Sequence, residues 1–176
     1  VWASLWSDRA LLYRQELGLD VTSSAMGVVV QALVEGNTSG VAFSRDPTNE
    51  DRMVIEAVHG LNQGLVDGAV EPDRWFISRK TLEVLSHQAP QERLCMVRRA
   101  AGLEIESAAG KGPPLTERYL ELVNTGLLQA ERDFGGPQYM EWTIRNGQLV
   151  VLQVRPVTAG DSAGDSRAWY LSLNRT

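Results

Sequence analysis

The chain has 176 residues, of which 43% are hydrophobic and 22% are charged, and its formal net charge is −5. This composition is typical of a folded globular protein and excludes a disordered chain. The acidic balance argues against nonspecific nucleic-acid binding, which normally requires a basic face, whereas a few well-placed arginines in an acidic protein can still hold phosphate.

The single cysteine, Cys95, excludes an internal disulfide and fits a reducing compartment, where we expect it to be a buried small residue. The chain has no apolar run long enough to cross a membrane and no signal-peptide pattern at its start. We therefore expect a cytoplasmic protein with no membrane contact. The first residues read as the middle of a helix and lack a methionine, so we expect a fragment of a longer protein.

The first third of the chain predicts a helix followed by a hairpin. Apolar residues at helical spacing predict an amphipathic helix that ends near Gly18. The run MGVVVQALV, residues 26–34, is apolar and β-branched, which predicts a strand buried on both faces. Turn residues at 35–40 then lead to a returning strand at 41–44.

The middle of the chain predicts further strands and a long helix. Residues 53–58 read as a strand, 59–73 as a glycine-bearing loop, and 74–78 with 82–88 as a second hairpin. A loop at 109–114 precedes a helix at 115–135, whose expected core side chains are Leu115, Tyr119, Leu122, Val123 and Leu127. A hairpin follows, and residues 159–176 read as a linker and the start of another element. The pattern predicts an α+β fold with a largely antiparallel sheet of hairpins and packed helices.

Three polar side chains stand in the last hairpin, residues 135–158. Glu141 lies in its first strand and Gln153 and Arg155 lie in its second, although both runs are otherwise rich in apolar residues. Carboxylate and amide oxygens suit a hard divalent cation such as Mg²⁺, and a guanidinium suits phosphate oxygens. From the residues alone, the alternative is that this face of an edge hairpin simply meets water.

The length of the turn determines which of these side chains share a face. We expect a three-residue loop at 145–147, with its glycine in the left-handed region, because this loop separates apolar from polar side chains. Ile144 then pairs with Gln148; the apolar face holds Ile144, Trp142, Val150, Leu152 and Val154, and the other holds Tyr139, Glu141, Gln153 and Arg155 beside Leu149 and Val151. A two-residue turn at 146–147 would place Glu141 on the opposite face from Gln153 and Arg155.

Five segments carry a resemblance to a known family. They are, in chain order, VWASLWSDRALLYR, MGVVVQALVEGNTSGVAFSRDP, VIEAVHGL, VDGAVEPDRWFIS and EWTIRNGQLVVLQVRPVT. They resemble the nucleotide-binding domain of the phosphoenolpyruvate synthase and pyruvate phosphate dikinase family, which rifampin phosphotransferases and water dikinases share. The step from Glu-Trp to Gln-x-Arg-Pro is the most specific part of the resemblance.

The resemblance implies an ATP-grasp fold, in which ATP lies between two subdomains, and it implies that residues 1–158 form the second of these. It further implies that Glu141 and Gln153 hold Mg²⁺ against the phosphates of ATP. Arg155 would contact those phosphates and is the catalytic residue that we expect in this chain.

The resemblance also assigns the adenine contact. The strand expected at 26–34 corresponds to the linking strand of the family, whose backbone meets the base. Gln31, Ala32 and Leu33 are the residues that this implies. Without the resemblance, the same run is interpreted simply as part of the core.

The partners implied by the resemblance lie outside the chain. They are ATP itself, a first ATP-grasp subdomain with its phosphate-binding lysine and arginine, and a swivelling domain whose histidine carries the phosphoryl group. His59 and His87 do not match the motif of that histidine, and we interpret both as non-catalytic. The final acceptor is open: pyruvate, an antibiotic and a glucan all fit.

One motif departs from the family pattern. The family usually has Gly-Leu-Gly-Glu where this chain has Gly-Leu-Asn-Gln at 60–63, and Glu56 just before it is either a polar contact or an ordinary strand carboxylate. We therefore expect the ATP- and Mg²⁺-binding half of a phosphotransferase that is inactive as a fragment. The alternative is a degenerate, non-catalytic nucleotide-binding or interaction module.

Overall fold

The computed structural model describes residues 1–20, 22 and 24–157, so the linker and following element expected at 159–176 lie outside the described residues. Two compact units make up this part of the chain. The first comprises Val1–Leu33, and the second begins at Val34. No helix in the described part is both long enough and apolar enough to cross a membrane.

The first unit contains two short helices instead of one continuous helix. A 3₁₀ helix, η1, covers Trp2–Trp6, and α1 covers Asp8–Glu16. Ser7 separates them because its backbone is extended and its hydroxyl accepts a hydrogen bond from the backbone N–H of Ala10, as an N-cap does. The predicted end near Gly18 is confirmed by the left-handed conformation of that residue, at φ 66°.

The strand predicted at 26–34 is wrong. These residues form no strand, and Val29 and Val30 are 83% and 93% exposed. β-Branched residues favour an extended backbone, but a strand also needs a neighbour that accepts its hydrogen bonds. Within the described residues, no strand pairs with this run.

The second unit is built on one mixed sheet. Its strands are β1 (Thr38–Phe43), β2 (Arg52–Gly60), β3 (Asp73–Ser78), β4 (Val84–Gln88), β5 (Leu94–Arg99), β6 (Gly102–Ser107), β7 (Gln138–Arg145) and β8 (Gln148–Pro156). The main order is β4-β3-β2-β1-β7-β8, and all these neighbours are antiparallel. The predicted strand at 53–58 and the predicted hairpin of 74–78 with 82–88 are confirmed, and the fold is α+β. The strand predicted at 41–44 is present, but it begins at Thr38, inside the predicted turn, and ends at Phe43.

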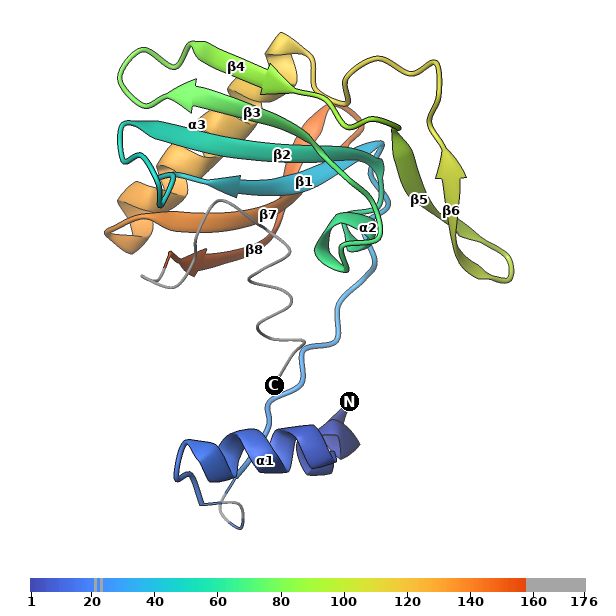
Figure 1. The fold of residues 1–176 in the computed structure, drawn as a ribbon, viewed down its shortest axis with the longest axis vertical. Helices are drawn as coiled ribbons and strands as arrows, with labels where there is room; N and C mark the ends of the chain where they lie inside the picture. The colour runs from blue at the N-terminus through green and yellow to red at the C-terminus, as the bar shows by residue number, and fades with distance from the viewer. Residues whose placement is uncertain (21, 23, 158–176) are drawn as a thin grey trace. The chain divides into compact units, whose positions relative to one another are not determined.

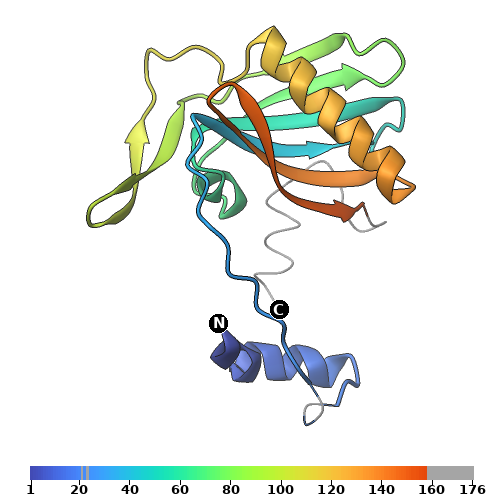
Figure 2. The ribbon, with the colours of Figure 1, turned by 180° about the vertical axis from the view of Figure 1, so that it is seen from behind.

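Helix α3, Glu117–Phe134, covers one face of this sheet (Figure 2). Thr116 caps its start, and Gly135 ends it with φ 72°, a conformation that glycine adopts without strain. The helix packs on a buried cluster that includes Val123 and Leu127 from α3 and Met140 and Trp142 from β7. The predicted helix at 115–135 is confirmed, with the difference that Leu120 is more deeply buried than Tyr119 and Leu122.

The opposite face of the sheet carries a second, smaller cluster. Val41, Phe43 and Tyr139 contribute to it, together with Leu65 from the short helix α2, Gln63–Val66. Figure 1 shows α2 on the side of the sheet away from α3. The segment expected to be a loop at 59–73 therefore contains a helical turn that closes part of this face.

The hairpin of β5 and β6 was not predicted. It joins the sheet through a short parallel pairing, in which His59 and Gly60 of β2 lie beside Cys95 and Met96 of β5. Its two-residue turn, Ala100-Ala101, lacks the glycine or asparagine that normally indicates a hairpin. Cys95 is buried here, at 2% exposure, as expected.

The last hairpin is present, but the predicted register near its turn is wrong. Its turn has two residues, Asn146 and Gly147, which both have positive φ, at 53° and 76°. Arg145 pairs with Gln148, and the ladder then shifts between Trp142 and Glu141. Two left-handed residues match the twist of a tight hairpin, which is why Asn-Gly favours this turn over the three-residue loop.

Candidate functional site

A row of residues crosses four strands on the face opposite α3. Val41 of β1 lies directly between Glu56 of β2 and Glu141 of β7, and Glu141 in turn pairs with Gln153 of β8. Residues directly opposite in an antiparallel ladder point to the same side of the sheet. The ladder therefore places two carboxylates and one amide on one face.

The register shift in β8 is what brings Gln153 opposite Glu141. Trp142 pairs with Val151, and Glu141 pairs with Gln153, so Leu152 is the extra residue of a bulge. A regular ladder from the two-residue turn would have placed Leu152 there and turned Gln153 to the other face. Glu141 and Gln153 therefore lie close together as predicted, but the cause is the bulge at Leu152 and not a three-residue loop.

Glu141 is half-buried and is held from two sides. Its Oε1 accepts a hydrogen bond from the Tyr139 hydroxyl at 3.1 Å, and its Oε2 accepts one from Nδ2 of Asn62 at 3.3 Å. Burial raises the pKa of the Glu141 carboxyl above its ordinary value, and these two hydrogen bonds and the charge of Arg155 oppose the rise only in part. The carboxylate therefore lies in surroundings that favour a nearby positive charge.

Arg155 lies beside this carboxylate. It pairs with Tyr139 across the β7–β8 ladder, and its guanidinium carbon lies 4.3 Å from the centre of the Tyr139 ring. Such stacking fixes the plane of a guanidinium, and Nη1 donates to the carbonyl oxygen of Pro156 at 3.4 Å. Because Tyr139 also contacts Glu141, the structure brings Arg155, Glu141 and Gln153 to the same face.

Glu56 extends the row on the far side of Val41. It is 2% exposed, and its Oε1 accepts a hydrogen bond from Nε of Arg74 at 2.6 Å. Its Oε2 is buried and accepts no hydrogen bond from the described residues. Glu56 thus forms an ion pair with Arg74 of the neighbouring strand β3, as an ordinary strand carboxylate does, and a contact of Glu56 with a ligand stays a prediction.

Asn62 was not predicted as a site residue. It is the N-cap residue of α2 and is 8% exposed, and its contact with Glu141 links the β2–β3 connection to β7. The only signal in the sequence was the departure at 60–63, where asparagine stands at the position usually held by glycine.

The site offers few protein ligands for a divalent cation. Within the described residues, no group of three or more His, Cys, Asp or Glu side chains could hold a metal ion. Magnesium, however, is commonly bound through one or two carboxylates together with substrate phosphates and waters. One half-buried carboxylate with an amide opposite it fits that pattern and does not fit a closed structural metal centre.

The residues expected to meet adenine belong to the other unit. Gln31, Ala32 and Leu33 are exposed and lie in the irregular segment that ends the first unit. Their expected role as adenine contacts stays a prediction.

Other polar residues of the second unit have structural roles. Asp46 is fully buried, accepts hydrogen bonds from Thr48 and pairs with Nε of Arg52 at 2.5 Å, so it stabilises the β1–β2 turn. His59 lies 2.9 Å from the carbonyl oxygen of Gly112, and His87 stacks on Trp75.

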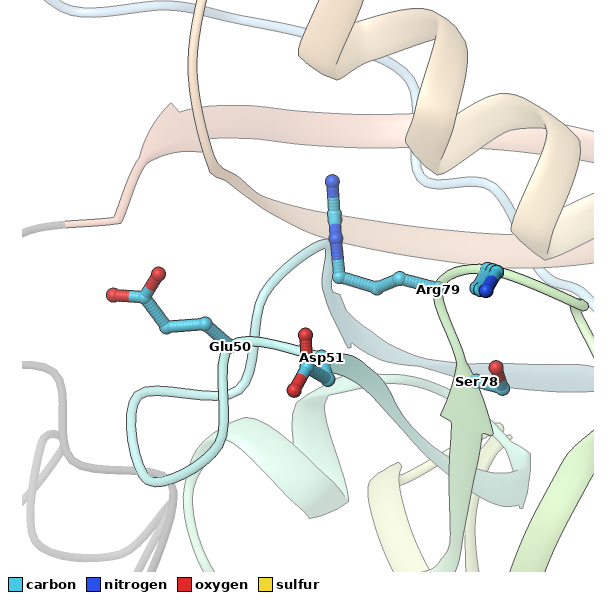
Figure 3. Close-up of a pocket in the computed structure, with 5 residues that line it drawn as sticks. Glu50, Asp51, Ser78 and Arg79 are labelled. Carbon is cyan, nitrogen blue, oxygen red and sulfur yellow. The ribbon is translucent and has the colours of Figure 1, made fainter.

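A separate open cavity of about 500 Å³ lies where β2 begins and β3 ends. Figure 3 shows Glu50 and Asp51 from the β1–β2 connection and Ser78 and Arg79 from the end of β3. The guanidinium of Arg79 donates to both oxygens of Glu131 in α3, at 2.7 and 3.0 Å, so its charge is already matched. The cavity contains none of the predicted site residues.

Comparison with known proteins places the chain among AMP/ATP-binding domains. The model of the pyruvate phosphate dikinase AMP/ATP-binding domain matches residues 1–169, and the chain belongs to this family. The resemblance inferred from the sequence is therefore confirmed.

Curated relatives of the chain carry two different enzyme names. The chain is 34% identical over 164 residues to a probable phosphoenolpyruvate synthase of Methanocaldococcus jannaschii and 35% identical over 162 residues to a rifampicin phosphotransferase of a Streptomyces species. Both matches cover 89% of this chain but only 14% and 19% of the respective relative. The chain thus spans less than a quarter of the length of these two proteins.

Proposed function

We propose that the chain supplies one wall of an ATP site in a larger phosphotransferase of the ATP-grasp type. Glu141 and Gln153 would hold Mg²⁺, and Arg155 would contact the phosphates of the nucleotide. The observation that supports this most strongly is the pairing of Glu141 with Gln153 on the face that also carries Arg155. The family match supports ATP as the nucleotide.

The residues of this wall would act by position and charge. Phosphoryl transfer requires little covalent chemistry from the protein, and it depends on alignment of the phosphates and neutralisation of their charge. Bound Mg²⁺ would supply that neutralisation. Arg155, whose guanidinium stacks on the Tyr139 ring, would orient the phosphates. Glu141 and Gln153 would hold the cation at the sheet.

The phosphoryl acceptor is proposed only as a class. The relatives carry the names probable phosphoenolpyruvate synthase and rifampicin phosphotransferase, which support a small-molecule acceptor. From the family resemblance we add a carrier histidine on another domain as the step before that acceptor. The first ATP-grasp subdomain and that histidine would come from outside this chain. A cytoplasmic location remains part of the proposal.

The proposal is tested by ATP consumption in the complete protein. We expect Glu141→Ala and Arg155→Ala each to reduce the rate at least about 100-fold, as the loss of a preorganised charge contact does. Exposed residues provide matched controls: Glu104→Ala and Arg98→Ala should leave the rate unchanged. Near-normal turnover in both site variants, with circular dichroism like that of the unaltered protein, would exclude the enzyme and favour the non-catalytic module.

A further inference from the structure

Asn62 is held rigidly at a position from which its side chain reaches β7. The backbone N–H of Leu61 donates to Met96 at 2.9 Å, and the carbonyl of Asn62 accepts from Leu65 and Val66 at 3.0 Å. Asparagine at this position of a helix normally caps it with its side chain, but Asn62 makes no such hydrogen bond. Its carboxamide is turned toward Glu141 instead.

The contact with Glu141 fixes which way the carboxamide faces. A carboxylate can only accept hydrogen bonds, so the nitrogen of Asn62 must be the atom directed to Oε2 of Glu141, at 3.3 Å. The reverse orientation would set two acceptors against each other. Hydrogen bonding therefore determines which end of the Asn62 carboxamide is the nitrogen, although the two orientations have nearly the same shape.

The remaining oxygen of Asn62 has no hydrogen-bond donor. Oδ1 is buried and accepts no hydrogen bond from any residue that the structure describes, and the whole residue is 8% exposed. A buried acceptor without a donor is unfavourable, and in a native structure it calls for an explanation, which can be structural or functional. This oxygen belongs to the side chain that contacts the carboxylate proposed to hold Mg²⁺.

We propose that Asn62 is a positioning residue for the Mg²⁺ site: its Nδ2 donates to Oε2 of Glu141 and orients the carboxylate that would hold the cation. This inference rests on the proposed function, because it needs a divalent cation at Glu141.

A residue that positions a metal ligand can be distinguished from a purely structural residue by the effect of its substitution on metal affinity. Removing a hydrogen-bond partner of a ligand or of its bound water typically weakens metal binding about 10- to 100-fold. The same change should not weaken nucleotide binding in the absence of metal. A purely structural role for Asn62 would alter both equally.

The experiment is calorimetric titration of the complete protein with ATP, first in EDTA and then with Mg²⁺. We expect Asn62→Leu, which keeps the shape but removes donor and acceptor, to lower the Mg²⁺-dependent gain in ATP affinity about 10-fold or more and to leave affinity in EDTA unchanged. Gln63→Leu, an exposed amide at the next position, is the matched control and should behave like the unaltered protein. An unchanged Mg²⁺ effect in Asn62→Leu would overturn the inference.

A second variant covers the case in which Asn62→Leu fails to fold. Asn62→Asp keeps shape and acceptor but places a second carboxylate beside Glu141, so Mg²⁺ with ATP should raise its melting temperature more than that of the unaltered protein. Equal shifts would contradict the proposed position of Asn62. Failure of the unaltered protein itself to show any Mg²⁺-dependent ATP binding would instead overturn the proposed function.

Discussion

Glu141 is held in conditions that do not suit an isolated carboxylate. It is half-buried, and its two hydrogen-bond donors, Tyr139 and Asn62, are neutral. A group in such a position lowers the stability of the empty protein and gains from any cation that binds next to it. The unfavourable burial of the Glu141 carboxylate therefore fits a cation-binding role.

Glu141→Gln is expected to stabilise the protein at neutral pH. The folded-state pKa of Glu141 is raised above its ordinary value of 4.5, so between these two values the folded state binds more protons than the unfolded state. The unfolding free energy consequently falls as pH rises through that window, and the penalty is complete above it. Glutamine removes the charge, so the variant should gain stability at pH 7 and lose that gain below the ordinary pKa.

Urea denaturation of both proteins at pH 7 and at pH 4 measures this difference. Glu104→Gln, on the exposed strand β6, is the control and should leave the stability at pH 7 unchanged. A Glu141→Gln variant that is less stable than the unaltered protein at pH 7 would contradict this expectation, because the hydrogen bonds from Tyr139 and Asn62 and the charge of Arg155 would then outweigh the cost of burial.

The strands β1, β7 and β8 show how far local sequence determines an element. Alternation of apolar and polar residues was sufficient to predict both strands of the last hairpin. It led to the closeness of Glu141 and Gln153 only through a three-residue loop that the structure does not contain. It could not predict the bulge at Leu152, because a bulge compensates for a shift elsewhere in the ladder and leaves little local signature. The run at 26–34 has stronger β propensity than β5 or β6, yet it lacks a partner among the described strands.

Gly40 allows β1 to fit between its neighbours, and we expect Gly40→Ala to destabilise the fold. A Cβ atom at this position would lie 2.0 Å from the backbone oxygen of Glu56 and 2.6 Å from the Trp142 ring, and the backbone of β2 cannot easily move away. The expected loss is about 3 kcal/mol in the unfolding free energy, at the upper end of overpacking effects. Denaturant titration measures it, and Gly112→Ala, which meets no atom within 4 Å, is the control and should change stability by less than about 0.5 kcal/mol.

At the scale of the whole molecule, the two faces of the sheet differ in role: one is structural, and the other carries the proposed site. One face is covered by α3 and carries the larger core, and the other carries the Glu56, Glu141 and Gln153 row. The helix α3 and its end at Gly135 could be predicted from spacing and a single glycine, because these signals are local. Asn62 could not be predicted, because its contact joins residues 79 positions apart in the chain.

Crystals grown with Mn²⁺ and a non-hydrolysable ATP analogue would locate the cation by its anomalous scattering. Because Mn²⁺ replaces Mg²⁺ at oxygen ligands, we expect a peak within about 2.2 Å of a Glu141 carboxylate oxygen, beside the amide of Gln153 and with the nucleotide phosphates at Arg155. A nucleotide and metal bound on the α3 face, or at the cavity beside Asp51 and Ser78, would contradict the proposed site.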